Sequence, residues 1–202
     1  MPTDATWSKL EASLSPLEQD TPKQSLPPVE RWDPPYCGDI GLKIGADGTW
    51  YYQSSPIRRQ PLVKLFASVL RKDLDGRTYL VTPAEKVDVE VEDAPFLAVE
   101  MEVQQAGSAA QQLILRTNVG DVVRCGSEHP LRFALQEPDG GLKPYVRVRG
   151  RLDALLTRAL TYELAELAVE LERDGHMLMG VWSGGEFFAV PDAPLSAAKP
   201  TR

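Results

Sequence analysis

The chain of 202 residues has little of what would place it in several common classes of protein. Its two cysteines, Cys37 and Cys125, are too few for a secreted disulfide framework and lack the paired spacing of a zinc site. We therefore interpret both as reduced thiols. No apolar run approaches membrane-spanning length, and the first residues have no apolar core of signal-peptide type. On these grounds we expect a cytoplasmic protein.

Common catalytic and cofactor signatures are missing as well. The phosphate-binding pattern Gly-x4-Gly-Lys-Ser/Thr, the dinucleotide pattern Gly-x-Gly-x-x-Gly and the nucleophile pattern Gly-x-Ser-x-Gly do not occur. The two histidines, His129 and His176, have no second histidine or cysteine at metal-binding spacing. We expect no metal, no cofactor and no catalytic residue, and we lean against an enzyme.

Composition is that of an ordinary globular protein, with 43% hydrophobic and 25% charged residues. The net charge of −7 argues against nucleic acid or a membrane surface as a partner, because phosphate backbones attract clustered Lys and Arg. A locally basic pocket and a protein partner both stay open.

Proline, acidic residues and hydrophobic periodicity divide the chain into four parts. We expect a flexible leader over residues 1–31, an N-terminal α+β domain over 32–83, a C-terminal α+β domain over 84–192 and a disordered tail over 193–202. An Asp-Gly pair at 47–48 lies between two strand-like runs and predicts a hairpin. Apolar residues at helical spacing from Leu62 to Leu70 predict a helix that starts near Pro61.

The same order of elements recurs later. A second Asp-Gly turn at 138–141 precedes a strand over 145–148 and an apolar pattern from Leu152 to Leu171 that predicts one long helix. A hairpin around Ser183–Gly185 closes the chain. We interpret this order as an internal duplication. The fold class we predict is α+β, with duplicated ββα-type units and mostly antiparallel sheets.

Basic residues stand just before both predicted helices. Arg58 and Arg59 precede the first helix, and Arg147, Arg149 and Arg151 precede the second. Arginine is unfavourable at a helix amino terminus unless an anion compensates, and the free backbone N–H groups there also favour an anion. We therefore expect an anion site, with Trp50, Tyr51 or Tyr145 available for stacking. The alternative is that these arginines pair with neighbouring acids, among them Asp39, Glu85, Asp93 and Asp121.

Several stretches resemble a bacterial family of unknown function, DUF1285. They are Trp32–Val103, RTNVGD at 116–121, KPYVRVRGRLDALLTR at 143–158 and VWSGGEFF at 181–188. The resemblance implies a duplicated α+β motif whose later half is superficially like a pleckstrin-homology fold, and a nucleotide-based ligand bound between the two domains. Ser54 stands where the family pattern has glycine.

These observations together predict a non-enzymatic binding or sensing protein that takes a small anionic, nucleotide-like ligand between its two domains and acts in signal transduction. The candidate ligand-binding residues are Trp50, Arg58, Arg59, Thr82, Glu85, Lys86, Asp93, Thr117, Asp121, Tyr145, Arg147 and Arg149. One alternative is a hydrolase or transferase on a phosphorylated small molecule, with Asp93 or Asp121 as the base. The other is a protein–protein adaptor, which would expose an apolar patch.

Overall fold

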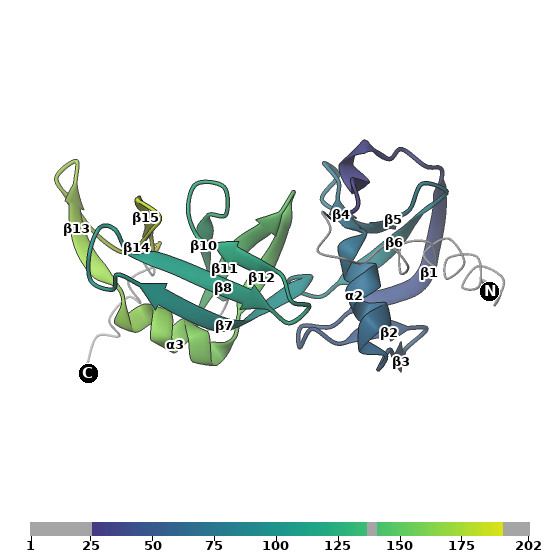
Figure 1. Ribbon diagram of the computed structural model, residues 1–202, viewed down its shortest axis with the longest axis horizontal. Coiled ribbons are helices and arrows are strands. Elements are labelled where there is room, and N and C mark those ends of the chain that lie inside the picture. Colours follow the sequence, from purple (N-terminus) through teal and green to yellow (C-terminus); the bar gives the residue numbers. More distant parts are fainter. Residues whose placement is uncertain (1–25, 137–140, 192–202) are drawn as a thin grey trace, which may run out of the picture. The chain divides into compact units, whose positions relative to one another are not determined.

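The computed structural model describes residues 26–136 and 141–191 and divides the chain into two compact units. The first unit extends to Phe96 and also includes the turns Asn118–Gly120 and Arg149–Leu152, and the second comprises the other described residues. Most of the expected leader, the tail from residue 193 and residues 138–140 of the second Asp-Gly turn lie outside the described residues. Figure 1 shows the elements of each unit along the chain.

The first unit is built on a six-stranded sheet in the order β3-β2-β1-β6-β5-β4. Strand β1 pairs in parallel with β6, and the other neighbours are antiparallel. The strands are β1 (Tyr36–Ile44), β2 (Trp50–Tyr52), β3 (Ser55–Pro56), β4 (Leu70–Lys72), β5 (Thr78–Val81) and β6 (Lys86–Val91). A short 3-10 helix, η1 (Val29–Arg31), precedes β1.

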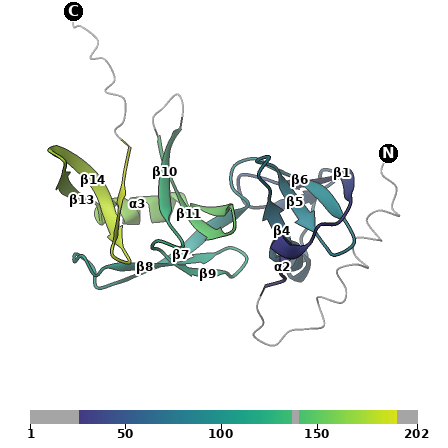
Figure 2. The ribbon, with the colours of Figure 1, turned by 90° about the horizontal axis from the view of Figure 1, so that it is seen from above.

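The predicted first hairpin and first helix are confirmed. Strands β1 and β2 pair across the turn at Asp47-Gly48, where Gly48 has a φ of 77° that glycine adopts without strain. Helix α2 (Gln60–Ser68) lies against one face of the sheet in Figures 1 and 2, and its Leu62 and Phe66 are buried. The helix ends at Ser68 rather than Leu70, which begins β4 instead.

The second unit contains a six-stranded sheet and a three-stranded sheet. The larger has the order β10-β11-β12-β7-β8-β9 and the smaller the order β13-β14-β15. The strands are β7 (Phe96–Gln104), β8 (Gln112–Thr117), β9 (Val122–Arg124), β10 (Leu131–Gln136), β11 (Gly141–Arg149), β12 (Leu152–Leu156), β13 (Val169–Arg173), β14 (His176–Ser183) and β15 (Glu186–Ala189). Helix α3 (Arg158–Glu166) lies between β12 and β13 in the sequence.

The long helix predicted from Leu152 to Leu171 is wrong. Residues 152–156 form strand β12, in which alternate residues are buried, and residues 169–173 form β13. Only α3, between them, is helical. The run Leu152–Leu156 is apolar at both helical and alternating spacing, so its periodicity is ambiguous. The run forms a strand because it pairs between β11 and β7 in the sheet.

The α+β fold class is confirmed. The sheets are largely antiparallel, and the two six-stranded sheets, each in a unit with one α-helix, are consistent with an internal duplication. The described units divide near residues 96–97, whereas we expected a boundary after residue 83. The difference arises because β6 completes the first sheet between β1 and β5.

Candidate functional site

A cavity of about 560 Å³ lies at the amino terminus of helix α2. Its lining includes Asp47 and Trp50 from the first hairpin, Arg58 and Gln60 from the start of the helix, and Asn118 from the turn that belongs to the first unit. The helix begins after Arg59, whose extended backbone makes it the N-cap and whose side chain forms no capping hydrogen bond. The first-turn N–H groups of α2 therefore lack a side-chain cap at this cavity.

Trp50 is the most deeply buried hydrophobic residue of this lining. The residue is 1% exposed, and its ring packs against the Phe66 ring with the two centroids 5.8 Å apart. Its indole N–H finds no hydrogen-bond acceptor among the described residues. Buried indole N–H groups usually have a partner, because leaving one unsatisfied costs about 1–3 kcal/mol. Trp50, a lining residue of the cavity, thus carries a buried donor that has no acceptor among the described residues.

The cavity carries charges of both signs. Arg58 is exposed, and the amino terminus of α2 adds partial positive charge. Asp47 contributes a carboxylate that accepts hydrogen bonds from the backbone N–H and the hydroxyl of Thr49, both at 2.9 Å. These hydrogen bonds, the backbone one first, lower the pKa of Asp47 below its ordinary value. The cavity can therefore offer donors to an anion and one ionised acceptor to hydroxyl groups.

Several other predicted site residues have structural partners. The hydroxyl of Thr82 accepts hydrogen bonds from the backbone N–H groups of Ala84 and Glu85, as the capping-box spacing predicts. Lys86 donates to Asp73 at 3.1 Å, and its ammonium lies 4.5 Å from the centroid of the Tyr79 ring. These contacts keep the end of β5 and the start of β6 in place.

The RTNVGD stretch is a closed turn. The hydroxyl of Thr117 accepts from the backbone N–H of Asp121 at 3.0 Å, and the Thr117 backbone N–H donates to the Asp121 carbonyl at 2.8 Å. Its neighbour Asn118, which we did not single out, lines the cavity. Asp93 lies elsewhere and lines, with Arg77, a separate groove of about 440 Å³ in the first unit.

Tyr145 and Arg147 lie together in the second unit. The guanidinium of Arg132 stacks 3.8 Å from the centroid of the Tyr145 ring, and Arg132 and Arg147 both donate to Asp153, at 2.9 and 2.6 Å. The carbonyl of Arg147 is 3.0 Å from a ring nitrogen of His129. Because Asp153 pairs with both arginines, this group fits the ion-pair alternative.

Arg149 does not precede a helix, because the residues after it form β12. Its guanidinium donates at 2.5 Å to the carbonyl of Ala67, in the last turn of α2, and lies 4.9 Å from the centroid of the Phe96 ring. A cation at a helix carboxyl terminus is favourable, since the carbonyl groups there carry partial negative charge. Of the two arginine groups predicted to precede helices, only the one before α2 does so.

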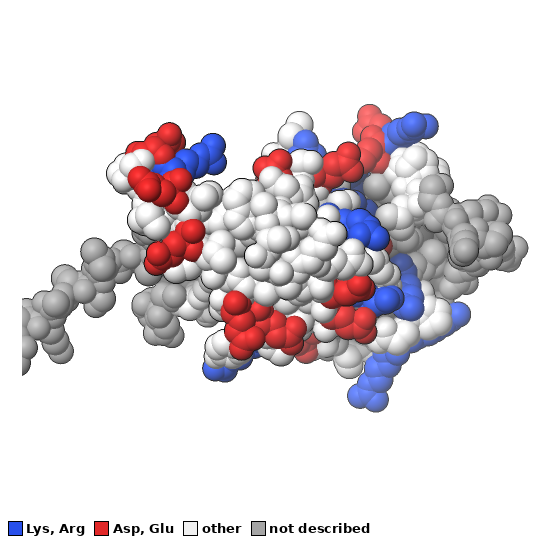
Figure 3. All heavy atoms as spheres, turned by 60° about the vertical axis from the view of Figure 1, so that its left-hand side comes forward, with Lys and Arg blue, Asp and Glu red and all other residues white. Residues whose placement is uncertain are grey.

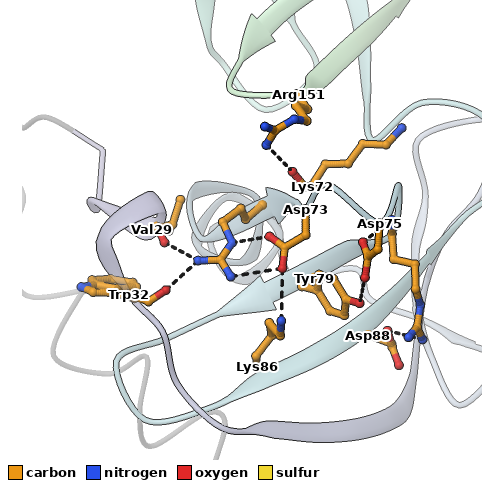
Figure 4. Close-up of polar contacts among 11 residues, drawn as sticks. Val29, Trp32, Lys72, Asp73, Asp75, Tyr79, Lys86, Asp88 and Arg151 are labelled. Atoms are coloured by element: carbon orange, nitrogen blue, oxygen red, sulfur yellow. Dashed lines mark hydrogen bonds and ion pairs between the residues drawn. The ribbon is translucent and has the colours of Figure 1, made fainter.

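Figure 4 shows a polar network around β4 that we did not predict from the sequence. Arg71, 8% exposed, donates to the carbonyls of Val29 and Trp32 at 2.8 and 2.7 Å. It also donates to Asp73 at 2.6 and 3.3 Å. Arg71 directly follows the apolar helix pattern, and its carbonyl partners, 42 and 39 residues away, leave no local signal in the sequence. This network attaches η1 and the following segment to β4.

The acidic side chains of β6 and of Glu92 just after it are exposed only in part. Glu90 and Glu92 are exposed, and Lys43 bridges them at 3.2 and 2.7 Å beside a groove of about 620 Å³. Asp88 is 8% exposed instead, and pairs with Arg77 and with the Tyr36 hydroxyl.

Two further properties concern only residues 26–136 and 141–191. In these ranges no cluster of three His, Cys, Asp or Glu side chains is placed to hold a metal ion. The helices found there are too short or too polar to cross a membrane.

Comparison with known proteins gives a consistent result. Residues 27–94 match the family described as "Domain of unknown function (DUF1285), N-terminal domain", and residues 95–190 match "Protein of unknown function (DUF1285), C-terminal domain". The crystal structure of a DUF1285 family protein from Silicibacter pomeroyi is 41% identical with a TM-score of 0.76, over 88% of this chain and 93% of that one. A DUF1285 family protein from Shewanella baltica is 29% identical with a TM-score of 0.49, over 63% and 92%. No curated protein matches. The chain belongs to the DUF1285 family.

Proposed function

We propose that this chain is a non-enzymatic binding protein that senses a small anionic, nucleotide-like ligand in the cavity at the start of helix α2. The observation that carries the proposal is that Trp50, whose buried indole N–H has no acceptor among the described residues, is one of the residues that line this cavity. A ligand that displaced the lining enough for one of its oxygen or nitrogen atoms to accept from this group would remove a cost of about 1–3 kcal/mol that the ligand-free protein bears.

The start of α2 favours an anion in the same cavity. First-turn N–H groups without a side-chain cap, together with the Arg58 guanidinium, are donors that suit a phosphate or carboxylate group. Gln60 and Asn118 add side-chain amides to the lining. The helix has nine residues, so its terminal partial charge is fully developed.

Asp47 restricts the class of ligand. An ionised carboxylate in the lining repels a second anionic group but accepts hydrogen bonds from ligand hydroxyls. A ligand with one anionic group and a hydroxyl-bearing part suits both the positive start of the helix and the Asp47 carboxylate. A nucleotide, with its phosphate and its sugar hydroxyls, is such a ligand. The cavity of about 560 Å³ falls within the usual range of small-molecule sites, roughly 300–1,000 Å³.

Isothermal titration calorimetry of the whole chain with inorganic phosphate, AMP, GMP and a cyclic dinucleotide tests the proposal. We expect one nucleotide to bind more tightly than phosphate. Arg58→Gln should weaken that binding about tenfold or more, because a charge-assisted hydrogen bond is lost. The matched control is Lys64→Gln, which removes an exposed positive charge from the same helix outside the cavity and should leave the affinity unchanged.

Trp50→Phe gives a second, independent test. It keeps an aromatic ring against Phe66 but removes the N–H donor, so we expect weaker binding. Thermal stability should fall little, because the gain from removing an unsatisfied donor offsets the loss of buried apolar area. Equal weakening by Arg58→Gln and Lys64→Gln would show that only net charge matters. Absence of binding by every nucleotide, or full affinity in Trp50→Phe, would overturn the site.

A further inference from the structure

A second feature of the chain, independent of the cavity, is a two-stranded arm formed by β13 and the first half of β14 (residues 169–179). Figures 1 and 2 both show it projecting at the end of the second unit. Its turn is Asp174-Gly175, with φ values of 54° and 76°, which is the two-residue turn typical of twisted hairpins. Strand β13 pairs with β14 and is an edge strand of its sheet.

Backbone alternation determines which groups face outward on β13. Val190 donates its N–H to the carbonyl of Met179, so the Met179 backbone faces β15, and the backbone of Leu178 faces β13. Leu178 is paired with Leu171, whose N–H and C=O therefore point toward β14. It follows that the N–H and C=O groups of Glu170 and Glu172 point away from the sheet.

The arm is also apolar on both of its faces. Val169, 41% exposed, lies on one face, and Met177 and Met179, 58% and 45% exposed, lie on the other together with Glu170 and Glu172. Edge strands are usually protected by charges and by few exposed apolar groups. Here β13 carries Glu170, Glu172 and Arg173. Both glutamates are at the positions whose backbone groups point away from the sheet, and they share a face with the exposed Met177 and Met179, whereas Arg173 lies on the opposite face. Figure 3 shows acidic groups together with a basic group on a protrusion next to largely uncharged surface.

We propose that β13 is a docking edge for an extended segment of a partner protein in which basic and apolar residues alternate. Such a segment would add a strand beside β13 and exchange hydrogen bonds with the backbones of Glu170 and Glu172. The partner residues in those two pairs lie beside the glutamate side chains, which favours Lys or Arg there. The residue between them lies beside Leu171 and would be apolar.

A second copy of the chain does not fit this edge. Two β13 strands joined as antiparallel neighbours about Leu171 would place Glu170 of each chain opposite Glu172 of the other. Shifting the register by two residues toward the turn pairs Glu172 with Glu172 and Glu170 with Asp174. Like charges directly opposite one another are destabilising, so the acidic edge selects a basic partner strand.

Fluorescence anisotropy of the whole chain with labelled peptides tests this. The probes are a short peptide that alternates Lys with Val and a matched peptide that alternates Glu with Val. We expect the Lys/Val peptide to bind, and the double variant E170K/E172K to weaken it about tenfold or more and to bind the Glu/Val peptide instead. The control is E163K/E166K, which makes the same change of net charge on exposed positions of α3 and should not exchange the preference.

Backbone methylation of the peptide separates strand addition from general charge attraction. A Lys/Val peptide N-methylated on alternate residues keeps its side chains but cannot donate to β13, and we expect it not to bind. Equal binding of the methylated peptide, equal effects of the two double variants, or no binding of the Lys/Val peptide would each overturn the proposal. So would a concentration-dependent dimer in sedimentation velocity that E170K/E172K abolishes, because the occupant would then be a second copy.

Discussion

Replacing Arg71 by methionine should destabilise the first unit more than any surface change near it. Arg71→Met keeps an unbranched apolar stem of similar length and removes the guanidinium. The carbonyls of Val29 and Trp32 then lose a donor each, and Asp73 retains only Lys86, at 3.1 Å (Figure 4).

The loss of unfolding free energy in Arg71→Met depends on the polar groups that are left without a partner. Removing one partner of a buried pair costs about 3–5 kcal/mol, because a desolvated charge is left without compensation. Here Asp73 is partly open to water, with 23% of its side chain exposed, and water can reach the two carbonyls if the η1 segment lifts. We therefore expect the lower end of the range, about 3 kcal/mol.

Urea unfolding followed by circular dichroism measures the loss, and hydrogen exchange locates it in residues 29–35 and in β4. The control is Lys43→Met in the same unit, where the lysine side chain is 37% exposed and its partners Glu90 and Glu92 are 69% and 42% exposed. That change should cost much less, because both partners remain in water after the lysine is removed.

A double variant, Arg71→Met with Asp73→Asn, separates the stranded charge from the lost hydrogen bonds. Because the carboxylate is gone, we expect it to be about 1–2 kcal/mol more stable than Arg71→Met alone. If Arg71→Met costs no more than Lys43→Met, or if the double variant is less stable than Arg71→Met alone, the assignment of this network as a buried anchor is refuted.

Three smaller predictions follow. The Asp75 carboxylate, which accepts the hydrogen bond of the Tyr79 hydroxyl, and burial raise the pKa of Tyr79 to about 12. The folded state therefore holds a proton that the unfolded state releases above pH 10, so stability should fall as pH rises from 10 to 12, and less so in Tyr79→Phe, as measured by unfolding at each pH. Cys37 is exposed and Cys125 is buried with its pKa raised to about 12, so a thiol reagent should label Cys37 at once and Cys125 only after unfolding; simultaneous labelling would contradict this. Ser54 has a φ of 65°, so Ser54→Gly should raise the free energy of unfolding by up to about 1 kcal/mol, and a lower midpoint in urea would be the opposite result.

Local patterns predicted the first half of the fold well. The Asp47-Gly48 turn and the apolar stripe of α2 are signals that need no distant partner, and both are confirmed. The run from Leu152 was misread because its spacing suits two structures and only the neighbouring strands β11 and β7 select one.

The candidate site was predicted in part for the same reason. Arg58 and Trp50 are close in sequence to the start of α2 and could be found from it, whereas Gln60 and Asn118 could not be selected among many amides without the fold. Arg149 was misplaced together with the helix it was thought to precede. Its partner, the carbonyl of Ala67, is 82 residues away in the sequence.

The parallel pairing of β1 with β6 has a consequence for how the first unit assembles. The sheet consists of two local three-stranded arrangements, β1 to β3 and β4 to β6, and β1–β6 is the one parallel pair among its neighbours. Each arrangement can form over short loops, but joining Ile44 to Val91 must close the long segment between them. That closure is the slow step in such a topology, and until it occurs the inner edges of both arrangements are open to other chains. The two halves of this sheet are thus most vulnerable to aggregation while still separate, during synthesis and refolding.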